Sequence, residues 1–117
     1  MSLSLKETQT VSEIAEVLYR FLPGKPHPYA AADLSFPGVA NKLGLSKFWM
    51  SGSKKPSIIQ LLQATLEYRR DKFCDLIVEI IRTGMAYLSN KGEPVTRDEI
   101  IKLNELIAQV KFKIPEL

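Results

Sequence analysis

The stretch that decides the fold is Ser57–Ser89, SIIQLLQATLEYRRDKFCDLIVEIIRTGMAYLS. No proline interrupts it, and its apolar residues recur with a period of about 3.6, the spacing of one helix face. That face consists of Ile58, Leu62, Leu66, Phe73, Ile77, Ile80, Gly84 and Leu88. Neighbouring apolar residues widen it, which predicts a central helix packed on two sides. A helix over the whole stretch would be unusually long for a globular domain, so we expect a kink or break between Arg69 and Lys72.

A shorter helix is expected before this stretch. Thr10 and Glu13 have capping-box spacing, and apolar residues continue at helical spacing as far as Leu22. The proline-rich residues 23–28 then end the helix, because proline lacks the backbone N–H that a helix needs. We expect no regular structure over 23–28 and a short helical turn over 30–34.

Two further helices have local start and stop signals. Residues 37–43 are expected to form a helix with Ser35 as its N-cap and Gly44 at its end. Near the C-terminus, Thr96 and Glu99 form a second capping-box match, followed by apolar residues at helical spacing. No alternating run is long enough for a sheet. The sequence therefore predicts an all-α fold, a single-domain bundle of four to five helices around one long central helix.

The chain has 117 residues, of which 45% are hydrophobic and 25% are charged, as in ordinary globular domains. We expect one helical domain over residues 1–117, with residues 1–9 poorly ordered or added in cloning. Because the chain ends on apolar Leu117 without a polar tail, we expect it to be a fragment of a longer protein.

Several kinds of chemistry are disfavoured by composition. The chain has one cysteine and one histidine, which excludes an internal disulfide and most zinc or triad sites. Arg20 and His27 have the spacing of the arginine–histidine motif of HEPN-type ribonucleases, but intervening prolines prevent one helix from presenting both. Cys74 lies in the apolar stripe and is expected to pack in the core. We expect no catalytic, cofactor-binding or metal-binding residues, no cofactor, no membrane span and a cytoplasmic protein that is not an enzyme.

The net charge of +3 is concentrated in one loop-rich segment, residues 23–56, which holds five lysines and one aspartate. The candidate contacts for nucleic acid or another anion are Lys42, Lys47, Lys54 and Lys55, with Trp49 as a stacking surface. The alternative is a solvated loop whose lysines serve solubility, and we favour it because the segment contains no arginine.

The same segment resembles the start of a helix-turn-helix motif. Ala40 is small enough for close helix packing, and Gly44 suits the turn. The recognition helix would begin near Ser46, but it would carry bulky apolar residues and meet Gly52 after about two turns. Since a recognition helix needs polar side chains facing the bases, nucleic-acid binding is possible but not favoured.

The expected long helix also carries an acidic stripe. Glu67, Asp71, Asp75 and Glu79 are spaced by four residues and would lie on one helix face. Local arginines such as Arg70 and Arg82, or the basic segment, could balance their repulsion. We expect the basic segment to fold back toward this stripe. Lys54 or Lys55 could pair with Glu67 or Asp71, but helix geometry makes Lys42 and Lys47 the better candidates.

The run from Phe48 to Pro56, the run from Thr65 to Arg70 and the run from Gly92 to Ile100 support a family resemblance. Over residues 18–117 the chain resembles an uncharacterised prokaryotic helical domain found at the N-terminus of larger proteins. Some of these resemble abortive-infection (phage-defence) proteins with a C-terminal HEPN-like domain. The resemblance implies no catalytic residues here, because the nuclease motif belongs to the other domain.

Together these features predict a non-catalytic interaction or sensing module of a larger prokaryotic protein. Its partners would be other domains of the full-length protein or a separate protein. The alternative is a nucleic-acid-binding domain that uses the helix-turn-helix-like basic segment 37–56.

Overall fold

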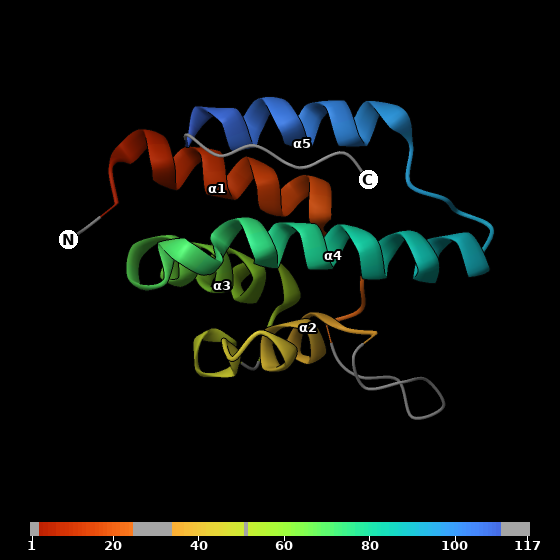
Figure 1. The fold of residues 1–117 in the computed structure, drawn as a ribbon, viewed down its shortest axis with the longest axis horizontal. Helices are drawn as coiled ribbons and strands as arrows, with labels where there is room; N and C mark the ends of the chain where they lie inside the picture. Colours follow the sequence, from red (N-terminus) through yellow and green to blue (C-terminus); the bar gives the residue numbers. More distant parts are fainter. Residues whose placement is uncertain (1–2, 25–33, 51, 111–117) are drawn as a thin grey trace.

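The computed structural model describes residues 3–24, 34–50 and 52–110. Within these ranges the chain forms five α-helices, one short 3₁₀ helix and no strand, which confirms the all-α prediction. The elements are α1 (Leu5–Leu18), α2 (Phe36–Lys42), η1 (Ser46–Phe48), α3 (Lys54–Tyr68), α4 (Arg70–Asn90) and α5 (Arg97–Gln109). In Figure 1, α1 and α5 lie above α4, and α2 lies below it. α1 packs against α5 and α3, and α4 packs against α3 and α2.

The predicted central helix is two helices, α3 and α4, joined at Arg69. The backbone angles of Arg69, φ −136° and ψ 56°, are not helical, so the chain changes direction there. The break lies inside the interval where the sequence predicted one. α3 contacts both α1 and α4, whereas α4 also contacts α2. The apolar residues of Ser57–Ser89 are therefore divided between two helices that face a shared core, instead of forming one face of a single long helix.

α1 begins earlier than predicted. Its N-cap is Ser4, whose hydroxyl accepts a hydrogen bond from the Glu7 backbone N–H. In turn, the Glu7 carboxylate accepts a hydrogen bond from the Ser4 backbone N–H. Thr10, the predicted cap, lies inside the helix and its hydroxyl donates to the Lys6 carbonyl at 2.8 Å. Residues 5–9, expected to be poorly ordered, therefore form the first turns of a helix. Both serine and threonine fit a capping box, and the helix starts from the earlier of the two matches.

The caps of α2 and α5 and the turn after α2 agree with the sequence predictions. The Ser35 hydroxyl accepts a hydrogen bond from Gly38 N at 3.1 Å, which caps α2. Gly44 follows α2 with a φ of 75°, a left-handed conformation that glycine adopts without steric cost. The predicted capping box of Thr96 and Glu99 begins α5. Apart from Leu34, the helical turn expected over residues 30–34 lies outside the described residues.

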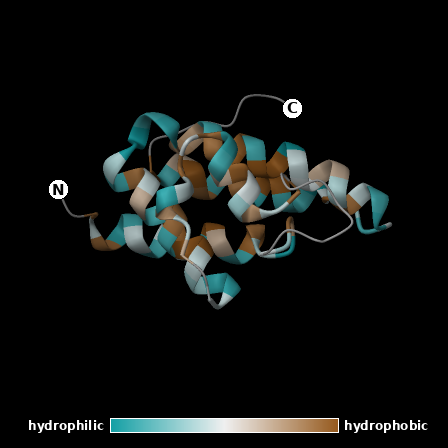
Figure 2. Cartoon of the chain, turned by 90° about the horizontal axis from the view of Figure 1, so that it is seen from below, coloured by the Kyte–Doolittle hydropathy of each residue, from teal (hydrophilic) through white to brown (hydrophobic). Residues whose placement is uncertain are grey.

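The core is built where the helices face one another, as Figure 2 shows by hydropathy. Its largest fully buried side chains include Phe21, Phe36 and Phe73. Phe21 follows α1 and packs directly on Gly84 of α4: a Cβ atom added to Gly84 would lie 2.9 Å from Phe21 Cβ. This distance is below ordinary van der Waals contact, so the glycine lets the chain after α1 approach α4. The same segment positions Tyr19 and Arg20, which are described below.

Candidate functional site

The basic segment does fold back onto the acidic stripe, through Lys42. Its Nζ, at the end of α2, lies 2.7 Å from Glu79 Oε1 on α4. Lys42 was one of the two lysines favoured for this pairing on geometric grounds. Its partner is the last acid of the stripe, because α2 packs against α4 beyond the Arg69 break. The contact joins two elements and partly neutralises the lysine.

Lys55 makes a different contact from the one suggested by the sequence. Its Nζ lies 3.1 Å from Glu16 Oε1 on α1. The suggested pairing with Glu67 or Asp71 is wrong, because Asp71 is bound by Arg69 at 3.2 Å. The start of α3 faces α1, so a carboxylate on α1 lies nearer than those at the far end of α3.

The acidic stripe itself is interrupted by the break between α3 and α4. Glu67 belongs to α3, whereas Asp71 and the two acids after it belong to α4. The break changes the helix phase, so the four carboxylates do not follow one continuous helical face. Arg70, expected to balance the stripe, instead binds Glu7 of α1 at 2.6 Å. This ion pair lowers the pKa of the Glu7 carboxyl from its usual range.

Two other candidates, Lys47 and Trp49, lie at and just after η1. The Lys47 ammonium is 5.3 Å from the centre of the Phe48 ring. Trp49 is half-buried and packs against the core, as predicted. Its ring is stacked on Phe36, with 6.1 Å between ring centroids and 7° between planes. One face of the indole is therefore occupied by the protein and is not available for a nucleic-acid base.

The recognition helix required by the helix-turn-helix alternative does not form. The chain after Gly44 makes only the three-residue η1, and Trp49 then has an extended backbone with ψ 125°. Phe48 and Trp49 pack against the core, and Gly52 has a φ of 131°, outside the helical region. Because these rings pack inward, this segment does not form the exposed polar helix that would contact bases in a major groove.

Lys54, the remaining candidate, lies in a pocket that the sequence did not reveal. The pocket has a volume of about 340 Å³. Its lining residues come from the end of α1, the start of α3 and the end of α4: Tyr19, Arg20, Leu22, Pro23, Lys54, Tyr87, Lys91 and Glu93. The Lys54 ammonium lies 4.2 Å from the centre of the Tyr19 ring. Burial, and then the charge of Lys91, lower the pKa of Lys54 from its ordinary value.

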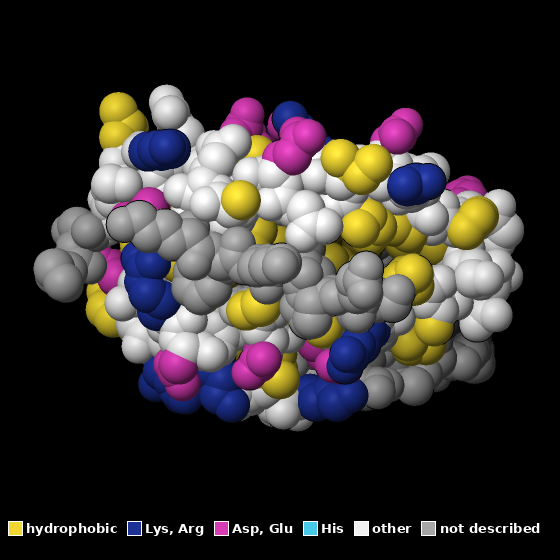
Figure 3. All heavy atoms as spheres, turned by 45° about the horizontal axis from the view of Figure 1, so that its top comes forward, with side chains coloured by type: hydrophobic (Ala, Val, Ile, Leu, Met, Phe, Trp, Pro, Cys, Tyr) yellow, Lys and Arg dark blue, Asp and Glu magenta, His cyan; other side chains and the backbone are white. Residues whose placement is uncertain are grey.

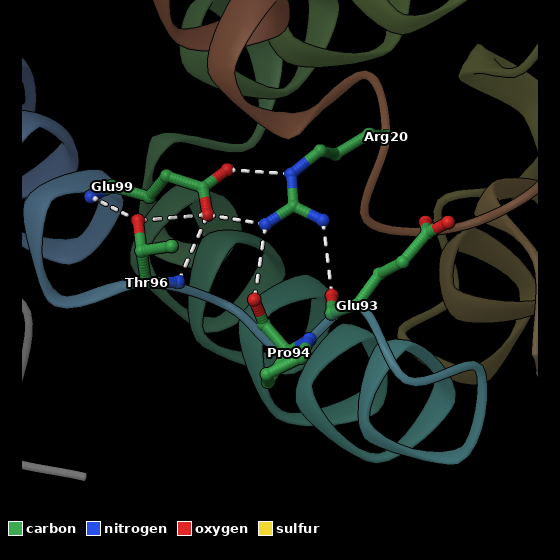
Figure 4. Close-up of polar contacts among 5 residues, drawn as sticks. All are labelled: Arg20, Glu93, Pro94, Thr96 and Glu99. Carbon is green, nitrogen blue, oxygen red and sulfur yellow. Dashed lines mark hydrogen bonds and ion pairs between the residues drawn. The ribbon is translucent and has the colours of Figure 1, made fainter.

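Beside this pocket, Arg20 holds α5 to the end of α1 (Figure 4). Its Nε donates to Glu99 Oε2 at 2.8 Å, and its Nη2 contacts Glu99 Oε1. The guanidinium also donates to the carbonyls of Glu93 and Pro94, at 3.1 and 3.2 Å. Hydrogen bonding from Arg20 lowers the pKa of the Glu99 carboxyl. Arg20 thus has a structural partner, whereas His27 of the considered ribonuclease spacing lies outside the described residues.

The remaining reactive side chain is Cys74 of α4. It packs against the core, as the sequence predicted, but is half-buried there. Burial, and then the negative charge of Asp75, raise the pKa of its thiol. Within the described ranges, no group of three or more His, Cys, Asp or Glu residues is placed to hold a metal ion. The helices described are also too short or too polar for a membrane span.

Comparisons with known proteins identify no relative. No family model, curated protein or solved structure matches the chain. The functional argument therefore depends on the described side chains and their contacts.

Proposed function

We propose that this chain is a non-catalytic interaction or sensing module of a larger cytoplasmic protein of a prokaryote. It would belong to a class of proteins of which some act in phage defence. The resemblance of residues 18–117 to an N-terminal domain of such proteins supports the link to further domains. The observation that carries the proposal is that two of the four lysines that would form a nucleic-acid interface, Lys42 and Lys55, are paired with carboxylates of the chain itself.

These lysines stabilise contacts between helices. Lys42 joins α2 to α4 through Glu79, and Lys55 joins α3 to α1 through Glu16. A lysine that binds a DNA phosphate displaces counterions from the nucleic acid, which is the main source of non-specific affinity. A lysine already paired to a carboxylate must first give up that partner. On the face drawn in Figure 3, which turns the α1 and α5 side of Figure 1 toward the viewer, basic and acidic side chains of the described residues are interspersed.

A different surface has the composition of a protein-binding site. We define it as the Phe48–Tyr68 surface, made by Lys47, Phe48 and Tyr68, with the exposed Met50 two residues after Phe48. The rings of Phe48 and Tyr68 are in contact, with centroids 6.2 Å apart. Tyr68 is 65% exposed and Met50 is 55% exposed. Tyrosine, phenylalanine and methionine are enriched at protein interfaces, so this surface favours a partner with an apolar patch and a carboxylate opposite Lys47.

The nucleic-acid alternative is tested by titrating labelled duplex DNA and RNA with the chain at several salt concentrations. We expect only weak binding, with a Kd above about 100 μM at physiological salt, weaker than ordinary non-specific DNA binding. A variant with Lys42, Lys47, Lys54 and Lys55 changed to Glu should alter this little. Tight, salt-sensitive binding that the variant abolishes would contradict the proposal.

The interaction itself is tested by photo-crosslinking in cells that express the full-length protein. A photoreactive amino acid at Tyr68 should give a defined crosslinked product. The same amino acid at Asn104, an exposed position on α5, is the control and should not. In a lysate of the same cells, excess purified chain should compete the Tyr68 product away, whereas a Tyr68→Ser chain should compete poorly. Equal crosslinking from both positions would remove the Phe48–Tyr68 surface as the interface.

A further inference from the structure

We propose that the pocket between Tyr19, Lys54, Tyr87 and Lys91 binds a dianionic phosphate group, either of a small organic phosphate monoester or of free inorganic phosphate. This site is separate from the Phe48–Tyr68 surface and does not depend on the proposed function. We call it the two-lysine pocket, after Lys54 and Lys91.

The size of the two-lysine pocket suits a small ligand. Its volume of about 340 Å³ is near the lower end of the usual range for small-molecule sites, about 300–1,000 Å³. Its walls come from segments far apart in sequence: Tyr19 follows α1, Lys54 begins α3, and Tyr87 and Lys91 lie at the end of α4. Because packing of three helices sets the shape, the site is assembled only in the folded chain.

Within the described residues, neither Lys54 nor Lys91 has a carboxylate partner, whereas Arg20, the third cation of the lining, is held by Glu99. The Lys54 ammonium lies over the Tyr19 ring and is 5.8 Å from the Phe36 ring centroid. The Lys91 ammonium lies 5.3 Å from the centroid of the Tyr87 ring. A cation–π contact supplies no acceptor oxygen, so the N–H donors of both ammonium groups can still bind an anion. Lys42 and Lys55, by contrast, are held by carboxylates.

The position of Lys54 is set by packing of its alkyl chain. A Cβ atom added to Gly24 would lie 3.1 Å from Lys54 Cγ, so this glycine leaves room for the lysine chain. A side chain held this way loses less rotamer freedom when a ligand binds. The lowered pKa of Lys54 shows that it feels the charge of Lys91 as well as its own burial. An anion between the two ammonium groups would offset this repulsion.

The charge of the pocket favours a dianion. A phosphate monoester carries a charge of about −1.5 to −2 at pH 7, since its second pKa is about 6. It can therefore neutralise both Lys54 and Lys91, whereas a phosphodiester has one negative charge. The lining also contains one carboxylate, Glu93, which opposes any anion. Removal of that carboxylate is expected to strengthen binding.

The ligand class is tested by calorimetric titration of the intact chain with four probes: adenosine 5′-monophosphate, its 3′,5′-cyclic diester, adenosine and inorganic phosphate. We expect the monophosphate to bind at least about tenfold more tightly than the cyclic diester, and adenosine not to bind. Inorganic phosphate binding as tightly as the nucleotide would identify the free ion as the ligand; weaker binding would identify an organic monoester. Equal affinity for monoester and diester, or no binding of either phosphate at about 10 mM, would overturn the proposal.

The residues are tested with matched variants. Lys54→Met and Lys91→Met keep most of the alkyl chain, remove the charge and should each weaken binding by at least about tenfold. Lys55→Met is the control, because the neighbouring Lys55 pairs with Glu16 instead, and it should bind as the unchanged chain does. Glu93→Gln should bind more tightly. Unchanged affinity in Lys91→Met, whose side chain is exposed, would place the ligand elsewhere.

Discussion

Arg20, which follows α1, and Glu99, in the first turn of α5, are joined by a two-pronged ion pair although they are 79 positions apart in sequence. The same Glu99 carboxylate accepts a hydrogen bond from Thr96 N at 2.9 Å and so completes the capping box of α5. One side chain thus begins a helix and attaches it to the end of another. Arg20 also donates to the carbonyls of Glu93 and Pro94, and both Arg20 and Glu93 line the two-lysine pocket.

The two roles of Glu99 are separable by substitution. Glu99→Gln retains an oxygen for the capping box and weakens the ion pair, so we expect a loss of about 1 kcal/mol in the free energy of unfolding. Glu99→Ala loses the cap as well, and should cost roughly 1 kcal/mol more. Urea unfolding of the three proteins measures both steps. Equal stability of the Gln and Ala variants would show that the cap contributes nothing.

The ion pair also gives stability a pH dependence. Arg20 lowers the pKa of Glu99 from its ordinary value of 4.5, so the folded chain binds this proton less tightly than the unfolded chain does. The contribution is therefore complete above the ordinary glutamate pKa and is lost as pH falls through the lowered one. The stability difference between the unchanged chain and Glu99→Gln should shrink across that acidic range. A difference that stays constant down to about pH 2 would contradict this assignment.

Gly84→Ala tests the close approach of Phe21 to α4. Alanine in a helix is favoured over glycine by about 1 kcal/mol. Here its Cβ would lie 2.9 Å from Phe21 Cβ and 3.2 Å from the Phe21 carbonyl oxygen. Overpacking of this kind costs about 1–3 kcal/mol, so we expect a net loss of stability. Ala86→Gly, at an exposed position of α4, is the control for helix propensity alone. A stabilising Gly84→Ala would show that the chain has room there.

The stacking of Trp49 on Phe36 is accessible to fluorescence, because the chain has a single tryptophan. Trp49 is half-buried, so we expect its emission to lie at shorter wavelength than that of tryptophan in water. Phe36→Leu should keep most of the packing and move the emission slightly to the red. Phe36→Ala removes a buried ring and should cost about 3–5 kcal/mol. Emission and iodide quenching in the folded chain equal to those of free tryptophan would rule out the stacked arrangement.

The thiol of Cys74 is expected to react slowly. Burial and the negative charge of Asp75 raise its pKa, which reduces the thiolate fraction near neutral pH. Labelling by a maleimide reagent at pH 7 should be slower than for a small free thiol. Asp75→Asn removes one cause of the raised pKa and should speed labelling without unfolding, since Asp75 is exposed. Labelling as fast as that of a free thiol would show that the side chain is neither shielded nor perturbed.

The pair of Lys42 and Glu79 is tested by a double-mutant cycle with Lys42→Met and Glu79→Gln. The lysine side chain is 56% exposed, so we expect a coupling energy of only about 0.2–1 kcal/mol, screened further by salt. The effect of this contact is to orient α2 on α4 more than to stabilise the fold. A coupling energy indistinguishable from zero at low salt would show that the contact does not persist in solution.

Local sequence signals predicted what depends on neighbouring residues. The caps at Ser35 and Thr96, the turn at Gly44 and the interruption near Arg69 each depend on side chains or backbone preferences within a few positions. The predicted start of α1 was wrong because the chain has two capping-box matches close together, at Ser4 and Thr10. Local chemistry does not decide which of two capping boxes starts the helix when the helix can continue through the second one.

By itself, the sequence determined that the chain is helical and most of the side chains that form its core, because hydrophobic periodicity reports burial. Only the tertiary structure decided how the charges are used. Lys42 and Lys47 were comparable candidates in sequence, yet Lys42 meets Glu79 whereas Lys47 lies over Phe48. Lys54 and Lys55 are adjacent but face different partners, since successive residues on a helix point about 100° apart. Pairings between distant residues depend on the angle at which helices cross, and that angle is set by the packing of the whole core.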